Sequence, residues 1–166
     1  MIDTSDISPS LGQLFSELVD GASTPGGAFI LNSGDAGLLG SLDKLTAAQA
    51  SRASEGGATI AAHAEHLYYG LSLMNRWASE GGDPFSDATW EAAWKTTAVD
   101  ERGWEEIRAR LREVTRRWRE ALAAPRRAAR AELNGMIGSI AHLAYHMGAI
   151  RQIAARARGP REGTFQ

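Results

Sequence analysis

The sequence predicts an all-α protein, a four-helix bundle with one long connection and a short extra helix. Apolar residues recur at intervals of three and four in four separate stretches, which is the spacing of one helix face. β-branched residues are sparse and no useful length of chain alternates polar with apolar residues, so we expect no strand. Three long stretches and a shorter, divided first one suggest a bundle whose chain crosses one end.

The first helix is predicted over residues 8–20, with Ser8 as its N-cap and Pro9 at its first position. The glycines and proline of residues 21–27 break it. A short amphipathic helix over residues 36–45 follows.

The second long helix is expected from about Thr59 to Ala78, after the break at residues 54–59. A Gly/Asp/Pro loop then leads to a short segment that carries Trp90 and Trp94 four residues apart.

Asp100 has the position of an N-cap for the third long helix, and Pro125 ends that helix. The last helix is predicted from about Asn134 to Ala157 and is closed by Gly159 and Pro160.

Length and composition restrict the function. The 166 residues fit one domain, residues 1–166, with a frayed tail over about 159–166. The chain has no cysteine, which excludes disulfides, thiolate metal sites and a cysteine nucleophile. A net charge of −2 gives no general attraction to nucleic acid or an anionic membrane, and no apolar run approaches the roughly 18 residues of a membrane span. We therefore expect a cytoplasmic protein with neither nucleic acid nor membrane as a partner.

The four histidines fall in two close pairs, His63 with His66 and His142 with His146. Residues three or four apart lie on the same face of a helix, so each pair can point into one site. Both pairs stand among Ala, Leu, Ile and Met, where protonated imidazoles would be costly. A divalent metal would remove that cost by taking a neutral nitrogen from each ring. The alternative is a set of core histidines that bond to backbone or water, or a half-exposed pair at one end of the bundle.

The segments "TIAAHAEHLYYG" and "HLAYHMGAIRQI" together resemble the DinB/YfiT-like superfamily of bacterial metalloproteins. The resemblance extends from about residue 36 to residue 153. It implies a four-helix bundle in which one histidine of the second helix and an H-x-x-x-H pair of the last helix bind a divalent metal. By position these ligands are His66, seven residues after Thr59, together with His142 and His146.

Two features depart from the family pattern. Many members carry a glutamine three residues after the last ligand, where this chain has Ala149 and only later Gln152. His63 is additional, and we expect it to lie behind the ligands or in the pocket wall. Tyr69 is a further candidate for the pocket wall.

Three imidazoles would leave an ion at full charge with an open coordination position, which is typical of catalytic sites. The ion is expected to be zinc, nickel or iron. The resemblance implies a thiol S-transferase or related enzyme, with mycothiol, bacillithiol or glutathione as co-substrate, an electrophile as second substrate, and a homodimeric assembly. The alternative is a metal-binding stress-response or interaction protein without catalysis, which a fourth protein ligand such as His63 would favour. No catalytic side chain is predicted.

Three glycines of the last helix, Gly135, Gly138 and Gly148, each lower helix stability by up to about 1 kcal/mol relative to Ala. They suggest close approach of a neighbouring helix or a second subunit. The arginines of the third long helix are interleaved with glutamates and are predicted to form a solvated, ion-paired surface.

Overall fold

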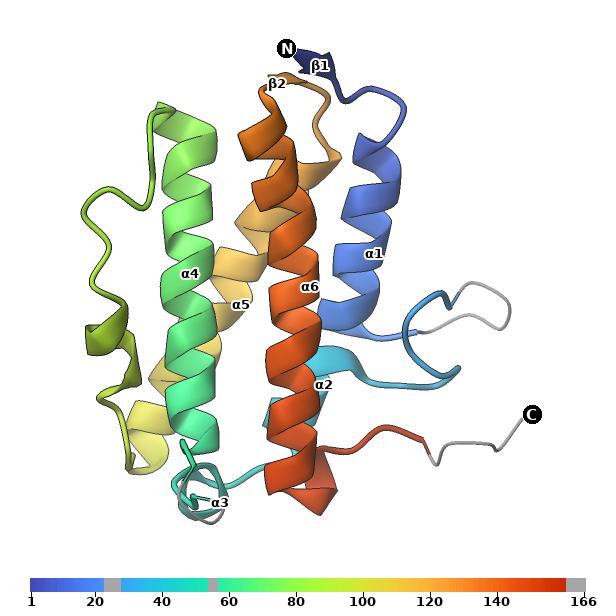
Figure 1. The fold of residues 1–166 in the computed structure, drawn as a ribbon. Helices are drawn as coiled ribbons and strands as arrows, with labels where there is room; N and C mark the ends of the chain where they lie inside the picture. The colour runs from blue at the N-terminus through green and yellow to red at the C-terminus, as the bar shows by residue number, and fades with distance from the viewer. Residues whose placement is uncertain (23–27, 54–56, 161–166) are drawn as a thin grey trace.

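A computed structural model describes residues 1–22, 28–53 and 57–160. Four helices lie alongside one another and form the bundle in Figure 1, with α6 in front of α5 and between α1 and α4. Their bounds are α1 Ser8–Asp20, α4 Ile60–Glu80, α5 Glu101–Ala123 and α6 Arg130–Ile153. The all-α bundle predicted from the sequence is thus confirmed.

Short elements fill the connections. Between α1 and α4 the chain forms α2 (Gly37–Asp43) and α3 (Ala47–Ala50), and between α4 and α5 it forms the 3-10 helix η1 (Trp90–Trp94). A second 3-10 turn, η2 (Ala155–Ala157), follows α6. Among the described helices none is long and apolar enough to cross a membrane.

The core forms where the apolar faces of the long helices meet. Along α5 this face consists of six buried residues, Trp104, Ile107, Leu111, Val114, Trp118 and Leu122. Both buried indoles have partners: Nε1–H of Trp104 donates to the Leu45 carbonyl at 2.9 Å, and that of Trp118 donates to Oγ of Ser139 at 2.8 Å. The second bond joins α5 to α6, so the two helices have a fixed register.

Polar N-cap side chains fix where α4 and α5 begin, and α4 carries two of the four histidines. Thr59 Oγ1 accepts a hydrogen bond from the Ala62 backbone at 3.1 Å and starts α4, and Gly81 ends that helix with φ 74°. Asp100 Oδ1 accepts from the Gly103 backbone at 2.7 Å, as the N-cap prediction required. Because α4 begins at Ile60, His63 and His66 lie in its first two turns.

Three sequence predictions about the elements are wrong. A two-stranded antiparallel ribbon exists, β1 (Ile2–Asp3) with β2 (Arg127–Ala128), although no strand was expected. Ser8 is not the N-cap of α1, because its hydroxyl donates to Thr4 Oγ1 at 2.9 Å. The last helix is shifted relative to its predicted bounds: it begins at Arg130, where the Glu132 carboxylate accepts from the Ala129 backbone, and it ends at Ile153 and not at Ala157, so Gly159 and Pro160 do not close it.

Parts of three further predictions lie outside the described residues. These are the glycine and proline break at 23–27, the break at 54–56, and the frayed tail at 161–166.

Candidate metal centre

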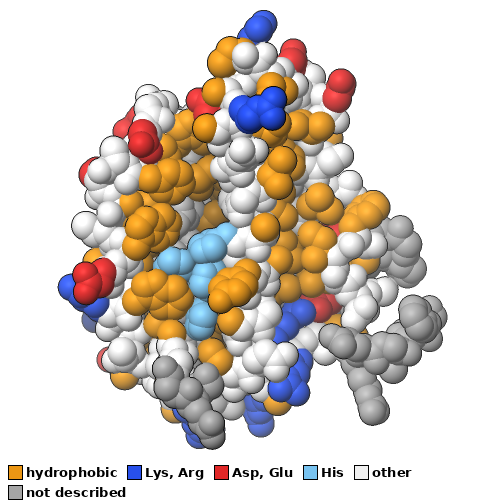
Figure 2. All heavy atoms as spheres, in the orientation of Figure 1, with side chains coloured by type: hydrophobic (Ala, Val, Ile, Leu, Met, Phe, Trp, Pro, Cys, Tyr) orange, Lys and Arg blue, Asp and Glu red, His pale blue; other side chains and the backbone are white. Residues whose placement is uncertain are grey.

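The two histidine pairs meet between α4 and α6. His63, His66 and His146 are buried, with exposed fractions of 9%, 6% and 3%, and His142 is half-buried. Figure 2 shows the imidazoles at the bottom of a depression on one face of the molecule, surrounded by hydrophobic side chains. Helices far apart in sequence thus bring all four rings to one place.

Three of the rings present the same nitrogen to a common point. Nε2 of His142 lies 3.1 Å from Nε2 of His66 and 3.0 Å from Nε2 of His146. Within the described part of the chain, His66, His142 and His146 form a group whose ligand atoms are close enough to share one ion, and no carboxylate belongs to it. These are the three residues expected as ligands.

The separations fit a divalent ion. Two nitrogens at 2.0–2.1 Å from one ion stand about 2.9–3.4 Å apart for angles between octahedral and tetrahedral. Hydrogen bonds alone satisfy the group poorly, because one imidazole nitrogen offers either one hydrogen or one lone pair. Nε2 of His142 contacts two other nitrogens and can bond properly to only one of them, whereas an ion accepts all three lone pairs.

His63 stands behind the group and does not join it. Its Nδ1 lies 2.9 Å from Nδ1 of His146, on the opposite edge of that ring from Nε2. If Nε2 of His146 is kept free for an ion, Nδ1–H of His146 donates to Nδ1 of His63. By contrast, Nδ1 of His66 is buried without a hydrogen-bond partner.

The surroundings favour neutral imidazoles. Burial, with smaller contributions from the neighbouring histidines, lowers the pKa of His66 to about 4 and that of His146 to about 3. Burial also lowers the pKa of His63 and of His142. The rings are therefore uncharged at neutral pH, which is the state in which imidazole binds a metal.

Two tryptophans of η1 cover the α4 side of the site. The Trp94 ring stacks on His66, with centroids 4.2 Å apart and planes inclined by 24°, and the Trp90 ring lies 5.5 Å from the same imidazole. Tyr69 holds this loop, because its hydroxyl oxygen accepts from the Thr89 backbone N–H at 2.7 Å and its ring meets Trp90 edge-on. Tyr69 thus supports Trp90 and the loop from behind, and the place in the pocket wall suggested for it from sequence stays a prediction.

Two of the three tryptophans that flank the long loop lie at the site. Trp90 and Trp94 flank the long loop and lie at the site, whereas Trp77 flanks the same loop but is buried against Trp118. Their spacing along the chain does not show which of the three faces the histidines, because that depends on how the loop of residues 81–94 folds back onto α4. The direct stacking of Trp94 on His66 had no signal in the sequence.

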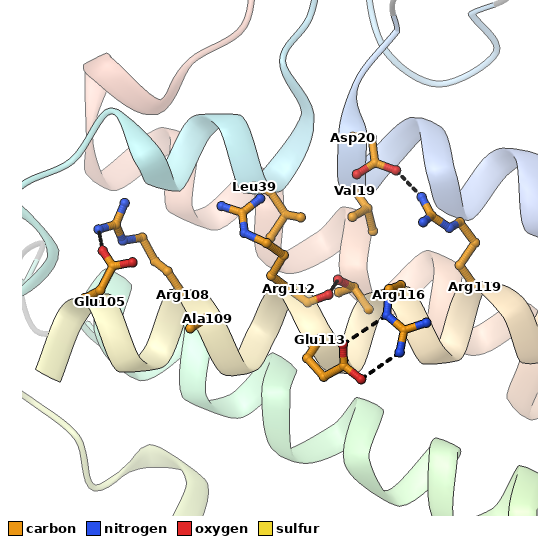
Figure 3. A pocket seen from close by; sticks show the side chains of 11 residues that line it. Val19, Asp20, Leu39, Glu105, Arg108, Ala109, Arg112, Glu113, Arg116 and Arg119 are labelled. Atoms are coloured by element: carbon orange, nitrogen blue, oxygen red, sulfur yellow. Dashed lines mark hydrogen bonds and ion pairs between the residues drawn. The ribbon is translucent and has the colours of Figure 1, made fainter.

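A pocket between α5 and the helices α1 and α2 is a weaker candidate for a functional site (Figure 3). Its volume is about 480 Å³ and no histidine lines it. Four arginines line it, but each is paired with carboxylates: Arg108 and Arg112 with Asp43, Arg116 with Glu113 and Glu120, and Arg119 with Asp20. The predicted ion-paired surface is therefore what α5 presents here, and little positive charge remains for an anion.

Comparison with known proteins gives one match. The family model of the DinB superfamily matches residues 33–150 of the chain. No curated protein and no solved structure matches the sequence. The matched range contains all four histidines.

Proposed function

Because the chain belongs to the DinB superfamily, we propose that it is a metal-dependent S-transferase that joins a low-molecular-weight thiol to an electrophile. The observation that carries the proposal is the grouping of His66, His142 and His146: Nε2 of His142 lies 3.1 Å and 3.0 Å from the Nε2 atoms of the other two, all three ligand atoms lie within 4.8 Å of one another, and no carboxylate is among them. Three neutral ligands leave the ion its full charge and an open position.

Each histidine has a distinct part in this proposal. His66, His142 and His146 hold zinc, nickel or iron through Nε2, and His63 fixes the ring of His146 through its Nδ1 contact. When bound there, the ion supplies Lewis acidity that keeps a thiol in its reactive thiolate form. Trp90 and Trp94 exclude water from the α4 side of the site.

The reaction is a substitution at carbon. The sulfur of mycothiol, bacillithiol or glutathione forms a new bond to the electrophilic carbon, and the leaving group departs with the bonding electron pair. The thiol proton is released to solvent. No side chain is assigned as the base, because the one further imidazole at the site, that of His63, is already engaged with His146.

The arrangement supports an enzyme over a metal-storage or interaction protein. A storage site gains from a fourth protein ligand that closes it, and His63 was the candidate for that role. Its Nδ1 instead contacts the far edge of the His146 ring, so the position left open on the ion stays available to a substrate.

We also propose a cytoplasmic homodimer. The exposed face of α6 supports it, because the helix carries no charged residue from Leu133 to Ile150. This face exposes Ile137 and Tyr145, at 49% and 71%. A second copy would cover apolar area that is otherwise in water.

The test compares the parent with a His142→Ala/His146→Ala variant, both purified without an affinity tag. Elemental analysis is expected to find about one divalent ion per chain in the parent and none in the variant. Conjugation of monochlorobimane to each of the three thiols, followed by fluorescence, is expected to exceed the uncatalysed rate only with the metal-loaded parent. A parent without metal after incubation with zinc, nickel or iron contradicts the proposal. A metal-loaded parent that conjugates no thiol supports the non-catalytic alternative.

A further inference from the structure

Two cavities lie along the bundle beyond the histidines. A cavity of about 230 Å³ lies between α4 and α6 and is bounded at one end by His142. A cavity of about 280 Å³ follows it toward the end of the bundle, and the two share Met74, Phe85 and Gly135. The two adjacent cavities are named here together the α4/α6 groove, and Figure 2 shows hydrophobic side chains along this part of the depression.

The cavity next to His142 is lined by no Asp, Glu, Lys or Arg, and carboxylates appear only at the far end of the groove, at Asp83 and Glu132. Leu67, Leu71 and Met74 line one side, and Phe85 and Trp90 of the long loop form a partly exposed aromatic wall. The polar side chains that line it are already engaged. Ser139 accepts from Trp118 and donates to the Met136 carbonyl at 2.7 Å.

At the far end Asp83 accepts from the Phe85 backbone at 2.9 Å, and Glu132 caps α6. Apart from the imidazole of His142, the side chains that line the cavity beside it therefore offer a ligand mainly apolar contacts, and the remaining carboxylate oxygens of Asp83 and Glu132 lie at the far end.

Glycines keep the groove open. A methyl group at Gly135 would lie 3.4 Å from Cε of Met74, an ordinary van der Waals contact with the end of that side chain. A methyl group at Gly138 would meet nothing within 4 Å. The close approach of a neighbouring helix expected for these glycines is not found at Gly138 or Gly148, and Gly135 meets only the Met74 side chain. Gly138 faces empty space beside His142, where a side chain would fill the cavity.

We propose that the α4/α6 groove binds an extended aliphatic chain of the electrophilic substrate, with the reactive carbon at the His142 end. The proposal rests on the S-transferase function above and adds the substrate class. Ala131 and His142 mark the two ends of the groove on α6 and are eleven residues apart, or about 16 Å. A linear aliphatic chain suits the apolar lining between His142 and Gly135, whereas a charged or highly hydroxylated substrate would lose hydration there without gaining hydrogen bonds.

The test measures binding of n-hexanol, n-octanol and n-decanol by calorimetry. These alcohols carry the chain without an electrophile, and each is titrated into metal-free and metal-loaded protein. Burial of each added methylene is expected to raise affinity about fourfold in both forms. Gly138→Ala is expected to weaken decanol binding and Gly138→Leu to reduce it more than tenfold. Gly148→Leu is the matched control, because Gly148 is on the same helix, also faces open space and lies outside the groove.

The outcomes separate the two proposals. Chain-length-dependent binding that Gly138→Leu removes and Gly148→Leu keeps supports the groove, even if the protein holds no metal. Affinity that is independent of chain length, or equal in Gly138→Leu and parent, overturns it, even if the S-transferase activity is real. A changed molecular mass of Gly138→Leu in light scattering, with decanol affinity intact, would assign the groove to contact with a second copy and also overturn it. Circular dichroism verifies that both Leu variants remain helical.

Discussion

Nδ1 of His63 lies 2.9 Å from Nδ1 of His146, while Nε2 of His146 faces His142 at 3.0 Å. The His146 ring is therefore held from both edges. Partners of this kind fix the tautomer and orientation of a metal-binding imidazole. The contact makes His63 a positioning residue for the proposed centre.

His63→Leu is expected to lower zinc affinity by 10- to 100-fold, because Nδ1–H of His146 loses its acceptor. His63→Asn is expected to recover part of the loss, since the Asn Oδ1 stands near the position of the imidazole Nδ1. Competition titration with a zinc chelator measures both. Equal affinities for the Leu and Asn variants would argue against a hydrogen bond between these rings.

His146→Leu is expected to lower metal affinity more than about 100-fold, a larger loss than for a supporting partner. The bundle should remain folded, because leucine suits a site that is 3% exposed among apolar neighbours. Elemental analysis and circular dichroism measure the two effects. Tyr145→Phe, at the adjacent exposed position, is the control and should keep full metal content. Full occupancy in His146→Leu would remove this residue from the centre.

The metal-free protein is expected to lose stability as the pH falls from about 6.5 toward 4. The unfolded chain binds protons on histidine near pH 6.5, whereas the folded pKa of His66 is lowered to about 4 and that of His146 to about 3. In this window the unfolded state holds more protons, so the free energy of unfolding decreases with each step toward acid. Urea titrations in chelator at several pH values test this.

The control for that series is the His66→Leu/His146→Leu variant. Without the two buried imidazoles its unfolding free energy should change less over the same pH range. A parent and variant with parallel pH profiles would show that these histidines do not cause the dependence.

Breaking the buried ion pair of Asp35 and Arg151 is expected to lower the free energy of unfolding far more than breaking a surface pair. Asp35, at 3% side-chain exposure, pairs with Arg151 at 2.6 Å and also accepts from the Gly37 backbone at 2.8 Å. Arg151→Met should reduce the free energy of unfolding by about 3–5 kcal/mol, because it leaves a buried carboxylate unpaired. Arg102→Met, which breaks the exposed pair with Glu106, should cost under about 1 kcal/mol. Chemical denaturation compares them, and equal losses would contradict the distinction.

The helices were predictable because burial of one face imposes a period on the sequence. The run from Trp104 to Leu122 shows that period along most of α5, and its six large apolar residues are all buried. The ribbon of β1 and β2 was missed because each strand has two residues, too few to show alternation, and the pairing joins Ile2 to Ala128. The start of α6 was missed because its first turn, with Arg130 and Ala131, carries no apolar stripe.

The sequence by itself determined the helical class, the two histidine pairs and, through its resemblance to a family, which three histidines to expect together. These depend on short-range spacing, since residues three or four apart share a helix face whatever the rest of the chain does. Only the tertiary structure decided that His63 contacts His146 and not the common point, that Trp94 and not Trp77 stacks on the site, and that Gly138 faces a cavity. Those relationships depend on the rotation and separation of α4 and α6, which many distant side chains set jointly by packing.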